Sequence, residues 1–161
     1  MTTLPFFLHY RYLSTFIVFF IQINYSLTTC AMSSSKNFEA ASSTYLRLKD
    51  ERGHWNNQAH NPAIDNFDGE RHQSMVELQK HLGQIGTSAD EIQRLMGPAS
   101  KTLDQPDLVL NHEFKRTDES YTFPKDAKIW IYEWRGNHDY VYFVLSNDNK
   151  VIRSDWYHAY E

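Results

Sequence analysis

The chain has 161 residues, a formal net charge of −4 and one cysteine. This length accommodates one domain with a single hydrophobic core, and an aromatic content of 15% is typical of a globular protein. The acidic balance and the absence of a Lys/Arg run argue against nucleic acid as a partner. A lone Cys30 excludes a disulfide framework and a cysteine-based zinc site.

A hydrophobic segment, residues 1–31, precedes the expected single domain at residues 32–161. Arg11, the apolar "FIVFFIQI" and the small residues "TCA" fit a signal peptide. Residues 12–31 could also associate with a membrane as an anchor, although polar residues make the span marginal. In the third alternative, translation begins at Met32 and residues 1–31 are a non-functional extension. The three alternatives stay open, and with them a membrane-associated, secretory or cytoplasmic location.

Apolar residues at helical spacing predict three helices in the first two thirds of the domain. Asp68 is the expected cap of the second helix. The third lies in "GTSADEIQRLMGP", where Thr87 is the expected N-cap, Gly97 the C-terminal glycine and Pro98 the barrier to continuation. The predicted helices span residues 38–52, 70–82 and 88–96.

The following segment, residues 99–128, is polar and weakly patterned. We expect a long exposed loop here, with the composition of a segment that can become ordered on a partner.

The last quarter of the chain alternates with period two and predicts three strands, residues 129–135, 140–145 and 151–157. Tight turns pair Trp134 with Val141 and Val141 with Trp156, and both hairpins then select the same inner face. That face comprises Trp130, Tyr132, Trp134, Val141, Phe143, Leu145, Ile152 and Trp156. The expected fold is α+β, with two or three helices packed on one face of a three-stranded antiparallel meander sheet.

His138 and Asp139 stand side by side in "WRGNHDY" and could be part of a catalytic site. Asn, Gly, His and Asp also suit the positive φ values of a hairpin corner, and neighbouring residues at a turn seldom point at each other. No recognisable nucleophile motif accompanies them. The sequence therefore predicts a corner and a protein that is not an enzyme. The alternative is a small hydrolase or lyase that uses His138 with Asp139 or Asp155.

The eight histidines form neither H-E-x-x-H nor H-x-H. His72 and His81 are nine residues apart on one predicted helix, too distant to share a metal ion unaided. A terminal clamp of His158 and Glu161 is possible, but the end of a strand is the simpler expectation. No metal site and no cofactor is predicted.

The outer sheet face is the expected binding surface, since Tyr and Arg are enriched where interfaces concentrate their energy. We expect a protein partner there, and Arg135→Asp should leave the fold intact while Trp134→Asp should unfold it. The alternative is that the helix at residues 38–52 covers this face and the tyrosines belong to the core. The expected binding residues are Arg135, Tyr140, Tyr142, Arg153 and Tyr157.

The order of a helix, "GTSADEIQRLMGPAS", a long connection and a first strand "WIYEWRG" resembles the SmpA/OmlA (BamE-like) family over residues 70–157. The resemblance implies two helices on a three-stranded sheet and a small non-enzymatic module that binds proteins or lipid. The chain departs from the family in its imperfect lipobox, in the 99–128 insertion and in the additional helix at 38–52.

Overall fold

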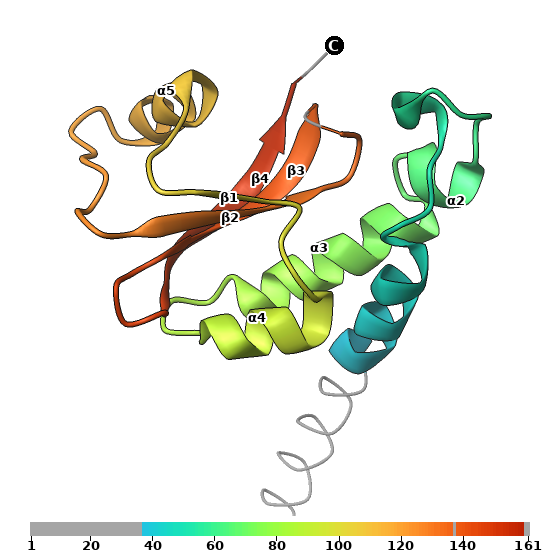
Figure 1. Cartoon of the computed structure of the whole chain (residues 1–161), viewed down its shortest axis with the longest axis horizontal. Helices are drawn as coiled ribbons and strands as arrows, with labels where there is room; N and C mark the ends of the chain where they lie inside the picture. The colour runs from blue at the N-terminus through green and yellow to red at the C-terminus, as the bar shows by residue number, and fades with distance from the viewer. Residues whose placement is uncertain (1–36, 137, 160–161) are drawn as a thin grey trace, which may run out of the picture. The chain divides into compact units, whose positions relative to one another are not determined.

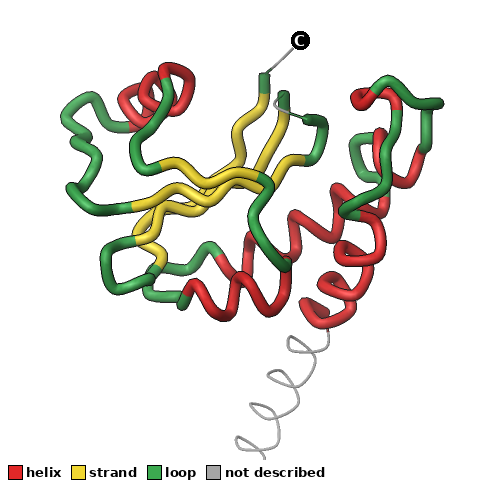
Figure 2. The backbone as a smooth tube through the Cα atoms, viewed as in Figure 1, coloured by secondary structure: helices red, strands yellow, loops and turns green. Residues whose placement is uncertain are grey.

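The structure, a computed structural model, describes residues 37–136 and 138–159. The segment 1–31 and its candidate membrane stretch lie outside the described residues. The fold is α+β, as predicted, with an antiparallel sheet between helices (Figures 1 and 2). A first helix covers residues 37–48. It is followed by η1 (His54–Asn56), α2 (Pro62–Asp65), α3 (Glu70–Leu82), α4 (Ala89–Met96), β1 (Lys101–Leu103), α5 (Leu108–Thr117), β2 (Lys128–Glu133), β3 (Asp139–Leu145) and β4 (Val151–His158).

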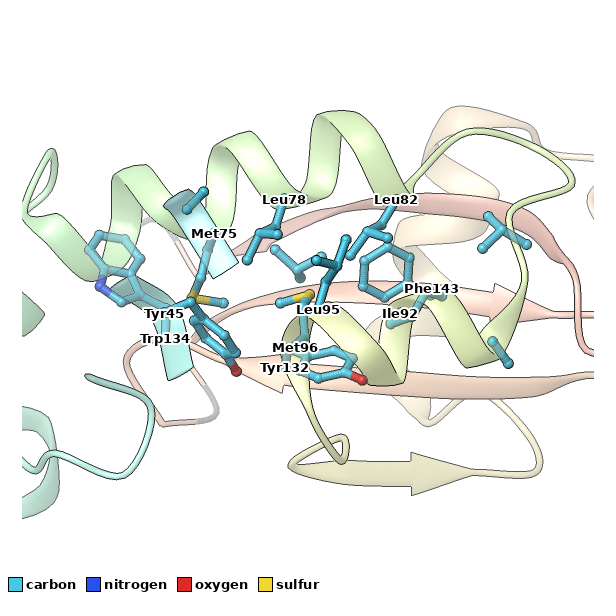
Figure 3. Close-up of a cluster of buried hydrophobic side chains, with 14 of the residues drawn as sticks. Tyr45, Met75, Leu78, Leu82, Ile92, Leu95, Met96, Tyr132, Trp134 and Phe143 are labelled. Carbon is cyan, nitrogen blue, oxygen red and sulfur yellow. The ribbon is translucent and has the colours of Figure 1, made fainter. Parts of the chain in front are cut away.

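The helix at residues 37–48, α3 and α4 cover one face of the sheet (Figure 1). Figure 3 shows Met75, Leu78 and Leu82 of α3 aligned above Tyr132 and Phe143 of the sheet. All five are completely buried. Complete burial of such a side chain contributes roughly 1.5–3 kcal/mol, so this layer is the main source of stability. The predicted inner face is confirmed for β2 and β3.

The ends of α4 follow from local chemistry. Ser88 is the N-cap, and its hydroxyl accepts a hydrogen bond from the Glu91 N–H at 3.3 Å, one position later than the predicted cap at Thr87. Gly97 has a φ of 71°, which favours glycine, and its N–H bonds the Gln93 carbonyl. The predicted cap at Asp68 is wrong, because α3 begins after Gly69 without a side-chain cap.

The expected loop at residues 99–128 contains two elements that the sequence analysis missed. β1 pairs with β2, which makes the sheet four-stranded in the order β1-β2-β3-β4. α5 lies on the opposite face of the sheet from α3 and α4 (Figure 1). Its buried residues Leu110 and Phe114 form a second hydrophobic cluster with Tyr140 and Tyr142. The three predicted helices do pack on one face of the sheet, as expected, and α5 adds an unpredicted helix on the other face.

The strand register differs from the prediction in two places. Tyr132 pairs with Val141 and Trp130 with Phe143, two residues away from the expected partners, so every side chain keeps its predicted face. Between β3 and β4, the pair of Val141 and Trp156 is confirmed. A β-bulge near Leu145 moves Ile152 to the α5 side, which corrects its predicted inward position.

No helix within the described residues has the length and apolarity needed to cross a membrane.

Candidate functional site

The β2–β3 corner is the centre of the candidate site. β2 ends at Glu133 and β3 begins at Asp139. The backbone N–H groups of Trp134 and Arg135 both donate to the Asp139 carbonyl, at 2.9 and 3.2 Å. Gly136 has a φ of 58°, which the turn requires. The hairpin corner predicted from "GNHD" is thereby confirmed.

The segment from η1 to α2 is attached to this corner by two neighbouring side chains. The Trp134 indole Nε1–H donates to the Ile64 carbonyl at 2.8 Å. Arg135 donates from Nε and Nη2 to the Asp65 carbonyl at 3.0 and 2.7 Å. These carbonyl groups end α2, where helix carbonyls lack partners within the helix and a nearby cation is stabilising. The corner therefore holds a loop that is distant in sequence.

Asp65 organises the same segment from its other side. Its Oδ2 accepts hydrogen bonds from the backbone N–H groups of His54 and Asn61, at 3.0 and 2.7 Å. Burial alone would raise the pKa of Asp65, but these two donors and the nearby His60 and His54 outweigh it and hold the pKa below its ordinary value. Gly53 lies so close that an added Cβ would be 2.3 Å from the Asp65 carboxylate. A side chain there would displace the Asp65 carboxylate from its two backbone donors.

Between the loop and the corner lies a cavity of about 450 Å³. Its walls are mainly aromatic and imidazole rings, with one arginine and one carboxylate among them. Phe67 is 62% exposed and Trp55 37% exposed, although both are large hydrophobic residues. Exposed aromatic rings around a cavity favour binding of another molecule. The lining residues are Trp55, Phe67, Trp134, Arg135, His138, Asp139, His158 and Ala159.

Asp139 is the one carboxylate in the cavity lining, and it is 8% exposed. Its Oδ2 lies 3.5 Å from Arg135 Nη1, and its Oδ1 lies 3.4 Å from His158 Nδ1. Oδ1 also accepts a hydrogen bond from the Ala159 N–H at 3.2 Å. The carboxylate is thus compensated by a cation, an imidazole and the backbone, as a buried charge requires.

The Arg135 guanidinium lies against two indole rings, with its carbon 4.0 Å from the Trp134 centroid and 5.4 Å from the Trp55 centroid. His72 supports the cavity from α3, with its ring 4.3 Å from Trp134 and 4.4 Å from Phe67. Its Nδ1 accepts a hydrogen bond from the Asp68 N–H, which fits a neutral ring. Burial lowers the pKa of His72.

Only one of the five predicted binding residues, Arg135, lies at this cavity. Tyr140 and Tyr142 are buried beneath α5, so the expectation of an exposed outer face is wrong. The alternative expectation is confirmed in that Tyr140 and Tyr142 belong to a core cluster, but it is wrong about the covering element, which is α5 and not the helix at residues 37–48. Arg153 lies over the rings of Phe114 and Tyr121, and Tyr157 stacks on Tyr140.

A second cavity, of about 320 Å³, lies on the α5 side of the same corner. Tyr140 and Tyr157 line it, together with Val109 of α5, which is 44% exposed. His138 and Ala159 line both cavities, so they form the boundary between them. The corner therefore has a hollow on each side of the sheet.

Sequence reasoning missed Trp55, Phe67 and His158 as members of one site. The available signal was the presence of two large aromatic residues in the Asn/Gly-rich loop between the first two helices. Asp155 does not line the cavity; it is the exposed residue of β4, and its carboxylate accepts a hydrogen bond from the Trp156 N–H. Within the described residues, no group of three His, Cys, Asp or Glu is arranged to hold a metal ion.

Comparison of the chain with models of protein families, with curated proteins and with solved structures yields no match. The resemblance to the SmpA/OmlA family therefore remains a prediction.

Proposed function

We propose that the chain is a small non-enzymatic interaction module that binds a protein partner through the corner cavity. The observation that carries the proposal is the aromatic cavity itself, whose walls include the exposed Trp55 and Phe67. Aromatic side chains, especially Trp, and Arg side chains in a pocket are the groups that most often anchor a protein interface. Here they have fixed positions, because Trp134 and Arg135 are bonded to α2 and Trp55 packs beside Arg135.

Fixed aromatic walls reduce the entropy lost when a partner binds. An apolar side chain of the partner would enter between Trp55 and Phe67. Polar groups at its edge would meet Asp139, His138 and His158. A lipid surface, approached by residues 12–31, is the other partner class that the sequence leaves open.

Paired substitutions of two exposed hydrophobic residues test this proposal. Phe67→Ser removes an exposed ring at the cavity, and Ile85→Ser removes a comparable group, 82% exposed, from the turn after α3. Each full-length variant is used to capture partners from the source cell extract, followed by mass spectrometry. We expect Phe67→Ser to lose partners that Ile85→Ser retains. Identical recovery with both variants would contradict the proposed site.

A second candidate function is acid–base chemistry, favoured by the 3.4 Å approach of His158 Nδ1 to Asp139. A carboxylate in this position can orient an imidazole as a general base. The lining residues include no Ser, Thr, Cys or Lys to act as a nucleophile, so the imidazole would have to activate water. Hydrolysis of generic ester or amide substrates that is lost in His158→Ala would favour this candidate; equal rates would exclude it for those substrates.

A further inference from the structure

β4 is an edge of the sheet, and among the described strands it pairs only with β3. The backbone N–H of Trp156 donates to its neighbour Asp155 Oδ1 at 2.8 Å, so it points away from β3. The Ala159 N–H, in contrast, donates to the His138 carbonyl on the β3 side. Backbone groups alternate in direction along a strand, and the N–H and C=O groups of Ser154 and Trp156 therefore face the open edge.

The beginning of this edge already has a partner within the chain. The Val151 N–H donates to the Thr87 carbonyl, and the Gly86 N–H donates to the Val151 carbonyl, both at 2.8 Å. This short pairing shows that the outward backbone groups of β4 accept a neighbouring strand. Residues 152–156 are the remaining part of the edge that could pair with another strand, and none of them is buried.

The side chains of β4 are complementary to a second copy of the same strand. In an antiparallel pair with Ser154 on a two-fold axis, Arg153 of each copy lies directly opposite Asp155 of the other. A pair centred on Asp155 would instead place two carboxylates opposite each other. We propose that two copies of the chain associate through residues 152–156 of β4, with Ser154 on the two-fold axis.

Two contacts prepare the strand for this pairing. The Arg153 guanidinium is held 4.7 Å from the Phe114 ring and 4.9 Å from the Tyr121 ring, which limits the entropy lost when it meets a carboxylate. The Asp155 carboxylate covers the Trp156 N–H in the single copy and exchanges that bond for the intermolecular ones. Charged residues that cover an edge in this way limit unspecific strand addition.

Charge exchange between two variants tests both the surface and the register. Arg153→Asp and Asp155→Arg each place like charges opposite each other when a copy pairs with itself. Mixed together, the two variants restore both opposite-charge pairs. In sedimentation velocity of the full-length chain, we expect each variant alone to have an about tenfold larger dimer dissociation constant than wild type. We expect the mixture to recover wild-type association.

Ser154→Pro provides a test that does not depend on charge. Its missing N–H faces the open edge, so the β3 ladder is retained while pairing with a second copy is blocked. For the charge variants, the matched control is Asp104→Arg, on the exposed connection after β1. It changes the charge as Asp155→Arg does and should leave association unchanged. A wild-type chain that sediments as a single copy at every concentration would overturn the proposal. A dimer that is insensitive to both Ser154→Pro and the charge exchange would also overturn the proposal. Association through residues 12–31 would give that result.

Discussion

At the scale of single residues, Arg135 contacts Asp65, Trp134 and Asp139 of the candidate site, which the sequence around it does not predict. One guanidinium group donates twice to the Asp65 carbonyl, lies over the Trp134 ring and approaches Asp139 at 3.5 Å. The Asp65 carbonyl belongs to the distant α2 segment, whereas Trp134 and Asp139 belong to the same corner as Arg135. The side chain therefore joins the loop after the first helix to the hairpin corner.

This position reverses the expectation that Arg135→Asp is harmless. The substitution leaves the Asp65 carbonyl without its donors and places a second carboxylate beside Asp139. We expect the free energy of unfolding to fall by about 2–4 kcal/mol, measured by urea denaturation. Arg52→Asp, at an exposed position in the loop after the first helix, should change the free energy of unfolding by less than about 0.5 kcal/mol. Equal effects of the two variants would contradict the attachment described for Arg135.

His72 predicts how stability depends on pH. Burial lowers the pKa of His72 in the folded chain; repulsion from His158 and Arg135 adds to this, while Asp68 and Asp139 partly oppose it. An unfolded histidine takes up its proton near pH 6.5, and the folded ring resists it. Below about pH 6.5 the unfolded chain therefore binds more protons at this histidine than the folded chain does. The contribution of His72 to the free energy of unfolding is fully present above that pH and is lost as the pH decreases.

His72→Phe keeps the ring contacts and removes the titrating group. We expect the decrease in unfolding free energy between pH 7.5 and pH 5.5 to be smaller in this variant than in wild type. Urea denaturation at both pH values measures the difference. An unchanged decrease would show that other groups cause it.

At the scale of elements, α5 decides which surface the molecule presents. Leu110 and Phe114 are four residues apart and both are completely buried against the sheet. Asp107 caps the helix, accepting the Leu110 N–H at 2.9 Å. The sequence did not predict this helix, because only two of its ten residues are buried and their periodic pattern is weak. The capping signal of Asp107 after Pro106 was present and would have marked its beginning.

Phe114→Ala tests the role of α5. The Phe114 ring contacts Tyr121 and Tyr142, and Arg153 lies over it. Its removal should lower the free energy of unfolding by about 3–5 kcal/mol. Leu108→Ala, in the same helix but 88% exposed, should have little effect. Similar melting temperatures for the two variants would contradict the packing of α5 on the sheet.

At the scale of the whole molecule, alternation in β2 and β3 was sufficient to predict the inner face of the sheet, and together with the helical spacing in α3 and α4 it predicted the α+β class. A two-residue error in the register of Tyr132 and Val141 was harmless, because side-chain direction repeats every two residues. The bulge that reorients Ile152 has no local sequence signal. The cavity was not predictable for a different reason: Trp55, Trp134 and His158 meet only after the fold brings three distant segments together.

The central claim is that a partner binds at the corner cavity, and site-specific photocrosslinking measures this most directly. A photoreactive phenylalanine is placed at position 67 or, as the matched control, at position 85 of the full-length chain in its own cells. We predict a discrete crosslinked adduct from position 67 that disappears with Trp55→Ala, and no corresponding adduct from position 85. No adduct from position 67, or the same adduct from both positions, would contradict the claim.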